Sequence, residues 1–357
     1  HEPRMQALSD DLAAQGLRPF HTPLGVMLDE GDPRSKCIRC ATCDGFPCLV
    51  DAKSDADVMC VRPALKKGGV TLVTEAKVTR LRTSASGREI TAVEVERRGE
   101  RLHVAADLVV VACGAINSAA LLLRSANDRH PRGLANGSGL VGRNLMKHQN
   151  GVMLAISKKP NPTAFQKTLA INDYYWGDEE FRYPMGHVSL VGKSNADMLA
   201  GDAPAFAPGY ALDQMARHSI DWWLTAEDRP AVENGVRLDG EQIVLEYHDN
   251  NTEAYDTLLR RWIQTLESIG MADHVVPHAL YFRKKIPLQG VAHQCGTLRF
   301  GTDPKTSVLD VFCRTHEIDN LYVVDGSFFP SSGAVNPSLT IMANALRVGD
   351  HLLERLR

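Results

Sequence analysis

The chain has 357 residues, a net charge of −3 and an isoelectric point near 6.5, with 44% hydrophobic and 23% charged residues. This length can bury a large core and predicts two domains. The balanced charge argues against a protein that binds nucleic acid or an anionic membrane, and the purest apolar strand, Leu108–Cys113, is far too short to cross a bilayer.

The N-terminal part of the chain predicts one helix followed by a long loop. Residues 4–16 have the periodicity of an amphipathic helix that ends at Gly16, and residues 17–60 have the composition of a loop. No charged-then-apolar leader opens the chain at HEPRMQALSD. That absence says little if an N-terminal segment is missing. The eight cysteines do not form the pattern of a small disulfide scaffold, and on this ground we predict a reduced, cytoplasmic setting.

Four cysteines in this loop follow the spacing C-x2-C-x2-C-x4-C. They are Cys37, Cys40, Cys43 and Cys48. The spacing is close to the ferredoxin pattern C-x2-C-x2-C-x3-C-P, but the last gap is longer and the proline precedes the last cysteine. Four thiolates could also hold zinc. The spacing therefore leaves an iron–sulfur cluster, a zinc site and a metal-free loop open.

The next stretch predicts strands that lead into a helix. Val70–Thr83 alternates in polarity, Val93 and Val95 alternate with charged residues, and a turn at 98–100 starts the return strand. A buried strand is predicted at Leu108–Cys113, and Gly114 separates it from a helix at 116–126. Free N–H groups at such a helix start can bind an anion or a polar cofactor edge.

Residues 126–150 are predicted to form a connecting loop that contains a misleading motif. GSGLVG (Gly137–Gly142) fits G-x-G-x-x-G, the fingerprint of dinucleotide binding. That fingerprint needs a buried strand before it, a helix after it and an acidic residue about 20 residues further on. The flanking sequence has none of these, so we predict that the motif binds no dinucleotide.

Residues 151 to about 286 change in composition and predict short mixed strands and one strong helix. The helix runs from about Thr252 to Gly270, with an apolar face on Leu258, Trp262, Leu266 and Ile269. Aromatic residues at 174–176 and 222–223 could stack on a sugar ring or belong to the core.

The C-terminal residues carry the most specific motifs. His293 begins the pattern H-x-x-G-T-x-R-x-G-x-D-P, and a neutral imidazole can act as a general base. An apolar strand ends in Asp325-Gly326, where ligands bind in open α/β sheets. Asn336-Pro337 opens a helix that reaches residue 356. Taken singly, each has an ordinary alternative: a structural histidine, an Asx-turn and an N-cap asparagine.

In their residues and in their order along the chain, these motifs resemble the C-terminal signature of the glucose-methanol-choline (GMC) oxidoreductase family. Gly139–His148 similarly resembles the connector between the two domains of that family. The resemblance implies an α/β (α+β) fold. Residues 1–150 and 291–357 would form a partial, Rossmann-like FAD-binding domain, and residues 151–290 an inserted substrate domain with a mostly antiparallel sheet.

The chain departs from the family pattern at its start. GMC proteins begin with a strand, a G-x-G-x-x-G turn and a helix for the FAD pyrophosphate, and nothing of that kind precedes His1. We expect a missing N-terminal segment on the order of a hundred residues, unseen or supplied as a separate chain.

The resemblance also assigns roles to individual residues. His293 would take the alcohol proton and Asn336 would orient the oxygen, while hydride passes to the flavin. The FAD contacts would come from four segments that converge on one cleft, with Val78, Gly114, Ala115, Ser118, Asp325, Gly326, Pro337 and Thr340. Many family members carry a cysteine-rich stretch before an A-K-S segment, here at 52–54, without metal, so we predict a metal-free structural loop.

The predicted function is that of an FAD-dependent oxidoreductase acting on the CH–OH group of a small-molecule alcohol or sugar. Two alternatives remain: a cofactor-free fragment that serves as a binding or scaffold subunit, and an iron–sulfur electron-transfer protein that uses the cysteine cluster. No nucleic-acid or membrane partner is expected.

Overall fold

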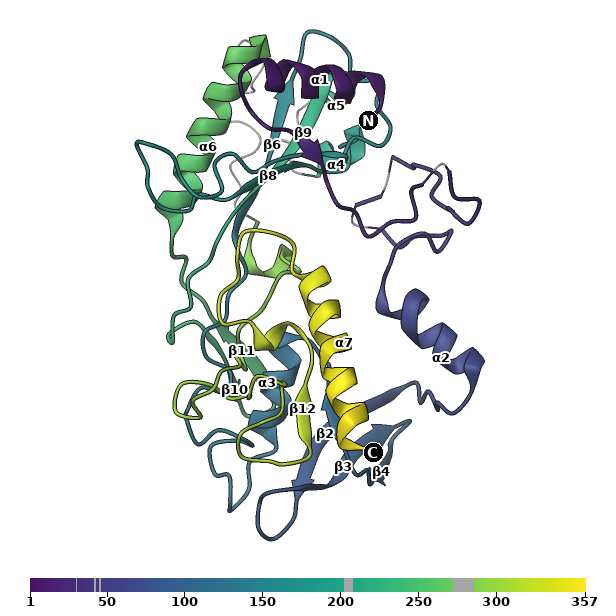
Figure 1. The fold of residues 1–357 in the computed structure, drawn as a ribbon, viewed down its shortest axis with the longest axis vertical. Helices are drawn as coiled ribbons and strands as arrows, with labels where there is room; N and C mark the ends of the chain where they lie inside the picture. Colours follow the sequence, from purple (N-terminus) through teal and green to yellow (C-terminus); the bar gives the residue numbers. More distant parts are fainter. Residues whose placement is uncertain (30, 42, 45, 202–207, 272–285) are drawn as a thin grey trace. The chain divides into compact units, whose positions relative to one another are not determined.

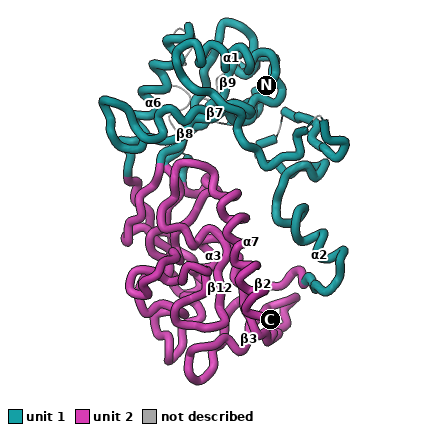
Figure 2. The backbone as a smooth tube through the Cα atoms, viewed as in Figure 1, with its two compact units in different colours: residues 1–72, 149–226, 251–287 teal, residues 73–148, 227–250, 288–357 magenta. Residues whose placement is uncertain are grey.

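The chain folds into two compact units. A computed structural model describes residues 1–29, 31–41, 43–44, 46–201, 208–271 and 286–357. Unit 1 comprises residues 1–72, 149–226 and 251–287, and unit 2 comprises residues 73–148, 227–250 and 288–357 (Figure 2). None of the helices in the described part of the chain has the length and apolarity that crossing a bilayer requires.

These units differ from the predicted functional domains at two stretches. Residues 1–72 belong to unit 1 because the N-terminal helix buries Met5, Leu8 and Leu12 in the core of that unit. Residues 227–250 belong to unit 2 because their hairpin contributes Val236 to the core of unit 2. Residues 272–285 of the predicted substrate domain lie outside the described residues.

Unit 1 is built around a five-stranded antiparallel sheet with the strand order β1-β7-β8-β9-β6. The strands are β1 (Phe20–His21), β6 (Gln149–Ile156), β7 (Leu169–Ile171), β8 (His187–Leu190) and β9 (Ser219–Ala226). The helical elements are α1 (Pro3–Ala14), η1 (Asp57–Val61), α2 (Arg62–Lys67), α4 (Ala196–Ala200), α5 (Gly209–His218), α6 (Thr252–Leu266) and η2 (Glu267–Met271). Figure 1 shows α1 and α6 beside β6, β8 and β9.

The core of unit 1 centres on two tryptophans. Trp222 of β9 and Trp262 of α6 are fully buried and pack edge to face with their ring centroids 4.6 Å apart. Leu258 and Leu266 are buried beside them, so the predicted apolar face of this helix is confirmed. Trp222 is therefore a core residue, whereas Trp176 is 78% exposed.

Unit 2 combines a three-stranded antiparallel sheet, a hairpin and a short parallel pair. The strands are β2 (Ala76–Thr83), β3 (Ile90–Arg97) and β4 (Glu100–Val104), then β10 (Gly235–Asp239) and β11 (Gln242–Glu246), and finally β5 (Val109–Val111) with β12 (Leu321–Val323). The helical elements are α3 (Ala115–Arg124), η4 (Leu288–Gly290), η5 (Gly326–Phe328) and α7 (Ser338–Arg355), and Figure 1 labels α3 and α7 near β12.

The prediction of a fully buried strand at Leu108–Cys113 is wrong in part. Val111 is buried, but Val110 is 45% exposed and Cys113 is also exposed. The reason is that β5 pairs in parallel with β12 and with no other described strand. An apolar run predicts an average tendency to be buried, whereas the number of neighbouring strands decides how much of it is covered.

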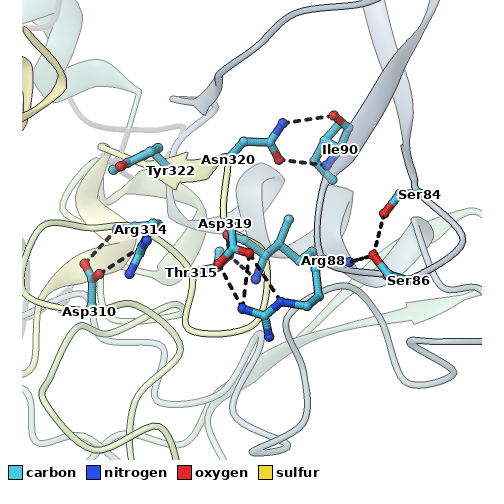
Figure 3. Close-up of polar contacts among 12 residues, drawn as sticks. Ser84, Ser86, Arg88, Ile90, Asp310, Arg314, Thr315, Asp319, Asn320 and Tyr322 are labelled. Carbon is cyan, nitrogen blue, oxygen red and sulfur yellow. Dashed lines mark hydrogen bonds and ion pairs between the residues drawn. The ribbon is translucent and has the colours of Figure 1, made fainter. Parts of the chain in front are cut away.

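The side chains of the two residues just before β12 attach this strand to the β2–β4 sheet. The Asn320 carboxamide accepts from the Ile90 N–H at 2.7 Å and donates to the Ile90 carbonyl at 2.9 Å, as a neighbouring strand would (Figure 3). Arg88 and Asp319 form an ion pair at 3.0 Å next to it. This attachment sets where β12 runs and therefore where Asp325 emerges.

The GSGLVG motif lies in turns between α3 and β6, without a strand before it or a helix after it. A Cβ atom at Gly142 would collide with the carbonyl oxygen of Val236 in β10. The glycine thus allows backbone packing on the hairpin, and the described residues around the motif lack the strand–turn–helix context of a dinucleotide fingerprint.

Candidate functional site

Asp325 is the centre of a junction at the carboxyl ends of β5 and β12. Because these strands are parallel, the turns that follow them meet at the same edge. One carboxylate oxygen of Asp325 accepts from the Gly114 N–H at 3.0 Å and from the Ser118 hydroxyl. The other accepts from the Ser327 N–H at 2.8 Å and from the Ser327 hydroxyl. Asp325 therefore joins the start of α3 to η5.

The four donors occupy the acceptor sites of the Asp325 carboxylate. An ionised carboxylate offers about four lone-pair sites, so Asp325 shapes the two turns and leaves their backbone to meet a ligand. The Asx-turn alternative describes this geometry correctly, because Asp325 caps η5 through its own side chain.

The H-x-x-G-T segment runs directly beside this junction. The Gly296 N–H donates to the Gly326 carbonyl at 3.1 Å, and the Thr297 hydroxyl donates to the Ala115 carbonyl at 2.6 Å. A Cβ atom at Gly326 would lie 3.0 Å from the Gln294 carbonyl oxygen. The structure thus brings Gly114, Ala115, Ser118, Asp325 and Gly326 together.

Two helix starts border the junction. Gly114 is exposed at a φ of 81°, and an added Cβ would meet no atom within 4 Å, so the turn before α3 faces open space. The 18-residue helix α7 starts after Pro337 without a side-chain cap, and Asn336 and Thr340 are both exposed there. Asn336 is therefore not the N-cap that its ordinary alternative would require. Uncapped N–H groups and the helix dipole favour a negatively charged or electron-rich ligand edge.

Val78 is the predicted cofactor residue that the structure leaves apart. It lies on β2, opposite Val95 of β3, and is 38% exposed. Within the described residues, no recorded contact joins it to the junction at Asp325. Its role stays a prediction.

His293 lies beneath this surface, paired with a second histidine. It is only 8% exposed, and its Nδ1 lies 3.0 Å from the Nδ1 of His148. The two rings are nearly perpendicular, with centroids 5.0 Å apart. Burial, reinforced by the nearby His148, lowers the pKa of His293 from 6.5 to about 4, so the ring is neutral at neutral pH.

His148 is a site residue that the sequence analysis missed, because it treated this residue as part of a connector. It is fully buried, has a φ of 72°, and places its Nε2 atom 3.1 Å from the Ser332 carbonyl oxygen. Burial also lowers the pKa of His148. A positive φ at a non-glycine residue is strained and often marks a functional site. No spacing rule connects residues 148 and 293, so nothing local predicted the pair.

A buried carboxylate holds the backbone around this pair. Asp228 accepts from the Lys147 N–H at 3.0 Å and from the Tyr247 hydroxyl at 2.6 Å. Its backbone N–H donates to the Ser332 hydroxyl at 3.0 Å, and that hydroxyl lies 3.1 Å from the Asp228 carbonyl. The segment that carries the Ser332 carbonyl is therefore fixed against the segment that carries His148.

The cysteine loop belongs to unit 1. Cys40 is exposed, Cys43 is buried, and Cys37 and Cys48 are partly buried. Among the residues that the structure describes, no group of three or more His, Cys, Asp or Glu side chains is arranged to hold a metal ion. The metal-free loop stays a prediction, and metal analysis should find less than one iron or zinc per chain.

The chain matches two family models, both described as GMC oxidoreductase. The N-terminal one matches residues 25–150 and the C-terminal one residues 186–345, which together make up most of the chain.

Curated relatives match almost the whole chain. It is 33% identical to paromamine 6'-oxidase of Streptomyces fradiae, over 94% of this chain and 62% of the relative. It is also 33% identical to 6'''-hydroxyparomomycin C oxidase of Streptomyces lividus, over 96% and 62%. A third relative, 2-methyl-1,2-propanediol dehydrogenase of Mycolicibacterium austroafricanum, is 30% identical over 80% of this chain and 55% of the relative. The chain thus spans about three fifths of the length of the first two.

Solved structures share the fold. Pyridoxine 4-oxidase from Mesorbium loti superposes with a TM-score of 0.56 at 23% identity, over 84% of this chain and 60% of that chain. Formate oxidase from Aspergillus oryzae gives a TM-score of 0.62 at 17% identity, over 84% and 63%. The mixed α/β fold class inferred from the sequence is confirmed.

Proposed function

Because the chain belongs to the GMC oxidoreductase family, we propose that it works as a flavin-dependent enzyme that oxidises the CH–OH group of a small-molecule alcohol or sugar. Family membership implies a flavin, and we propose that this flavin is FAD. When bound, it would supply the hydride acceptor.

The observation that carries this proposal is the buried, neutral His293 beside the junction at Asp325. A general base must be unprotonated at the working pH and held in a defined place. His293 meets the first condition because its pKa is lowered to about 4, and the second because its ring nitrogen pairs with His148. We propose that His293 takes the hydroxyl proton of the substrate and that Asn336, exposed at the start of α7, orients the hydroxyl oxygen.

The residues at the junction fit a flavin. Neither α3 nor α7 has a side-chain cap at its start, so backbone N–H groups of their first turns can face a polar cofactor, while the Gly114 N–H itself is held by Asp325. We propose that Gly114, Ala115, Gly326, Pro337 and Thr340 hold the flavin directly. Ser118 and Asp325 would act indirectly by keeping these turns in place, and Val78 is proposed to contact the adenine.

The substrate class rests on the names of the relatives. Two are named as oxidases of paromamine and of 6'''-hydroxyparomomycin C, and a third as the dehydrogenase of a diol. We propose a hydroxyl group on a small polar molecule of this kind.

Absorption and rapid-mixing kinetics test the proposal. The protein with its FAD should be yellow, with bands near about 370 and 450 nm. His293→Ala should slow flavin reduction by an accepted alcohol about 10²–10⁴-fold, and Asn336→Ala about 10–10³-fold. A protein that takes up no flavin would favour the cofactor-free scaffold instead. Unchanged reduction in His293→Ala would show that the proposed base is wrong.

A further inference from the structure

We propose that His148 is a positioning residue that holds His293 in the tautomer with its proton on Nδ1, so that Nε2 is the basic nitrogen. This inference deepens the proposed function, on which it rests for its catalytic meaning. It follows from two hydrogen bonds in unit 2, taken one at a time.

The Ser332 carbonyl determines the tautomer of His148. A carbonyl oxygen can only accept a hydrogen bond, and it lies 3.1 Å from the Nε2 of His148. The Nε2 atom of His148 must therefore carry a hydrogen. In the neutral ring, the other nitrogen, Nδ1, then carries a lone pair.

The His148 lone pair in turn determines the tautomer of His293. The two Nδ1 atoms lie 3.0 Å apart, a hydrogen-bond distance at which one must donate and the other accept. Since the Nδ1 of neutral His148 accepts, the Nδ1 of His293 donates. The lone pair of neutral His293 is therefore on Nε2.

The opposite arrangement would require a charged His148. An imidazolium could donate from both nitrogens, and His293 would then accept at Nδ1 and carry its proton on Nε2. Burial disfavours that charge and, with the Lys147 ammonium, lowers the pKa of His148, although the hydrogen bond to the Ser332 carbonyl acts in the opposite direction. Lys147 is itself buried, 3.5 Å from Asp249 and over the Tyr247 ring.

The carbonyl that starts this chain of hydrogen bonds is held firmly. Ser332 is bound through its hydroxyl to the backbone of Asp228, and the next residue, Gly333, donates its N–H to the Glu227 carboxylate at 3.2 Å. Groups in the protein interior thus determine the tautomer of His293. A buried carboxylate has the same effect on the histidine of a serine protease triad.

The consequence for the reaction is a base with a defined direction. When the Nε2 of His293 takes the hydroxyl proton, the O–H bond breaks and an N–H bond forms. The resulting imidazolium keeps its Nδ1–H donated to His148. Its positive charge therefore meets a lone pair in the interior, which offsets part of the cost of charging a buried ring.

A pair of variants separates the tautomer from mere packing. In His148→Asn, the carboxamide oxygen occupies nearly the place of Nδ1 and can still accept. In His148→Leu, the acceptor that His148 provides is lost. The ¹⁵N spectrum of the histidine-labelled chain at pH 7.5 should show His293 protonated at Nδ1 in the wild type and in His148→Asn, and protonated at Nε2 in His148→Leu. This measurement needs no flavin.

Flavin reduction kinetics supply the second readout. His148→Leu should slow reduction about 10- to 1,000-fold, less than the roughly 10⁴-fold cost of a wrong tautomer in a serine protease, whereas His148→Asn should recover most of the rate. If His148→Leu does not fold, the wild-type and His148→Asn spectra still decide. Finding His293 protonated at Nε2 in the wild type, or equally slow reduction in both variants, would overturn the inference. If the proposed base is wrong, His293→Ala will instead reduce its flavin as fast as the wild type, whereas the wild-type chain will still show His293 protonated at Nδ1.

Discussion

At the scale of single residues, the candidate site buries polar side chains, and burying such groups lowers stability unless they are hydrogen-bonded. His293 and His148 are buried as neutral rings, and Asp325 is buried with its carboxylate hydrogen-bonded on both oxygens. Buried polar groups are stable only when hydrogen-bonding partners in the protein satisfy them. Two predictions follow from this dependence.

The first concerns the pH dependence of stability. In the unfolded chain His293 takes up a proton near pH 6.5, whereas in the folded chain it does so only near pH 4. Between these values the unfolded state binds more protons, so the free energy of unfolding falls as pH falls, by at most about 3 kcal/mol from this residue.

Denaturant midpoints measured from pH 7 to pH 4.5 check this prediction. His293→Gln should flatten the slope only in part, because the pKa of His148 is lowered in the same direction. The neighbouring charged residues Lys147, Asp228 and Asp249 are present in both the wild type and His293→Gln, so the comparison isolates the effect of His293. An unchanged slope in His293→Gln would contradict the prediction.

The second prediction compares Asp325 with one of its donors. Asp325→Ala leaves the Gly114 and Ser327 N–H groups and two hydroxyls without their acceptor and should lower the free energy of unfolding by about 3 kcal/mol or more. Ser118→Ala removes one hydroxyl and should cost about 1–2 kcal/mol. Equal costs from chemical denaturation would show that the carboxylate is not the centre of the junction.

At the scale of the elements, a side chain can make the hydrogen bonds that a neighbouring strand would make. In the described part of the chain, β5 and β12 form a sheet of only two strands, yet the junction at Asp325 lies at the ends of these strands. The Asn320 carboxamide supplies the hydrogen bonds that another strand would supply to Ile90.

A third prediction follows for this attachment. Asn320→Ala should lower the free energy of unfolding by about 2–3 kcal/mol, because the buried Ile90 N–H and carbonyl lose their partner. The neighbouring Arg88→Gln breaks an exposed ion pair and should cost less than about 1 kcal/mol. Thermal unfolding of the two variants compares these costs directly, and a larger loss from Arg88→Gln would reverse the argument.

The fourth prediction concerns the cysteine loop. Hydrogen bonds from the backbone N–H groups of Ala52 and Val50 lower the pKa of the Cys48 thiol. Because the thiolate is the reactive form, iodoacetamide at pH 7.5 should modify Cys48 faster than Cys40, although Cys40 is the more exposed. Peptide mass spectrometry after timed quenching gives both rates. Faster modification of Cys40 would show that exposure outweighs thiol acidity here.

At the scale of the whole molecule, the described residues form two large hydrophobic cores and one small cluster of Leu154, Leu199, Leu212 and Ala216 in unit 1. One large core is centred on β9 and α6 of unit 1, and the other on α3 and β12 of unit 2. All four tryptophans lie in unit 1, at positions 176, 222, 223 and 262. Tryptophan fluorescence therefore reports directly on the packing of unit 1.

The fifth prediction uses this distribution. Leu258→Ala opens a cavity beside Trp262 in the core of unit 1 and should lower the free energy of unfolding followed by fluorescence by about 2–5 kcal/mol. Leu49→Ala, at a side chain of unit 1 that is 96% exposed, is the matched control and should leave the midpoint nearly unchanged. A comparable loss in both variants would contradict the assigned cores.

The sequence by itself determined the local elements and the family. Apolar periodicity located the helices that became α1, α3, α6 and α7, and the flanking residues excluded GSGLVG as a nucleotide site. The family resemblance is likewise confirmed by the two family models. These features depend on residues close together in the chain, where spacing translates directly into a helix face or a turn.

Only the tertiary structure decided which of these pieces meet. It brought Gly114 to Asp325 through a parallel strand pair, grouped residues 1–72 with the antiparallel sheet, and placed His148 against His293. Local periodicity shows that a side chain is buried but not what it is buried against. A hydrogen bond between residues 145 positions apart therefore depends on the path of the whole chain between them.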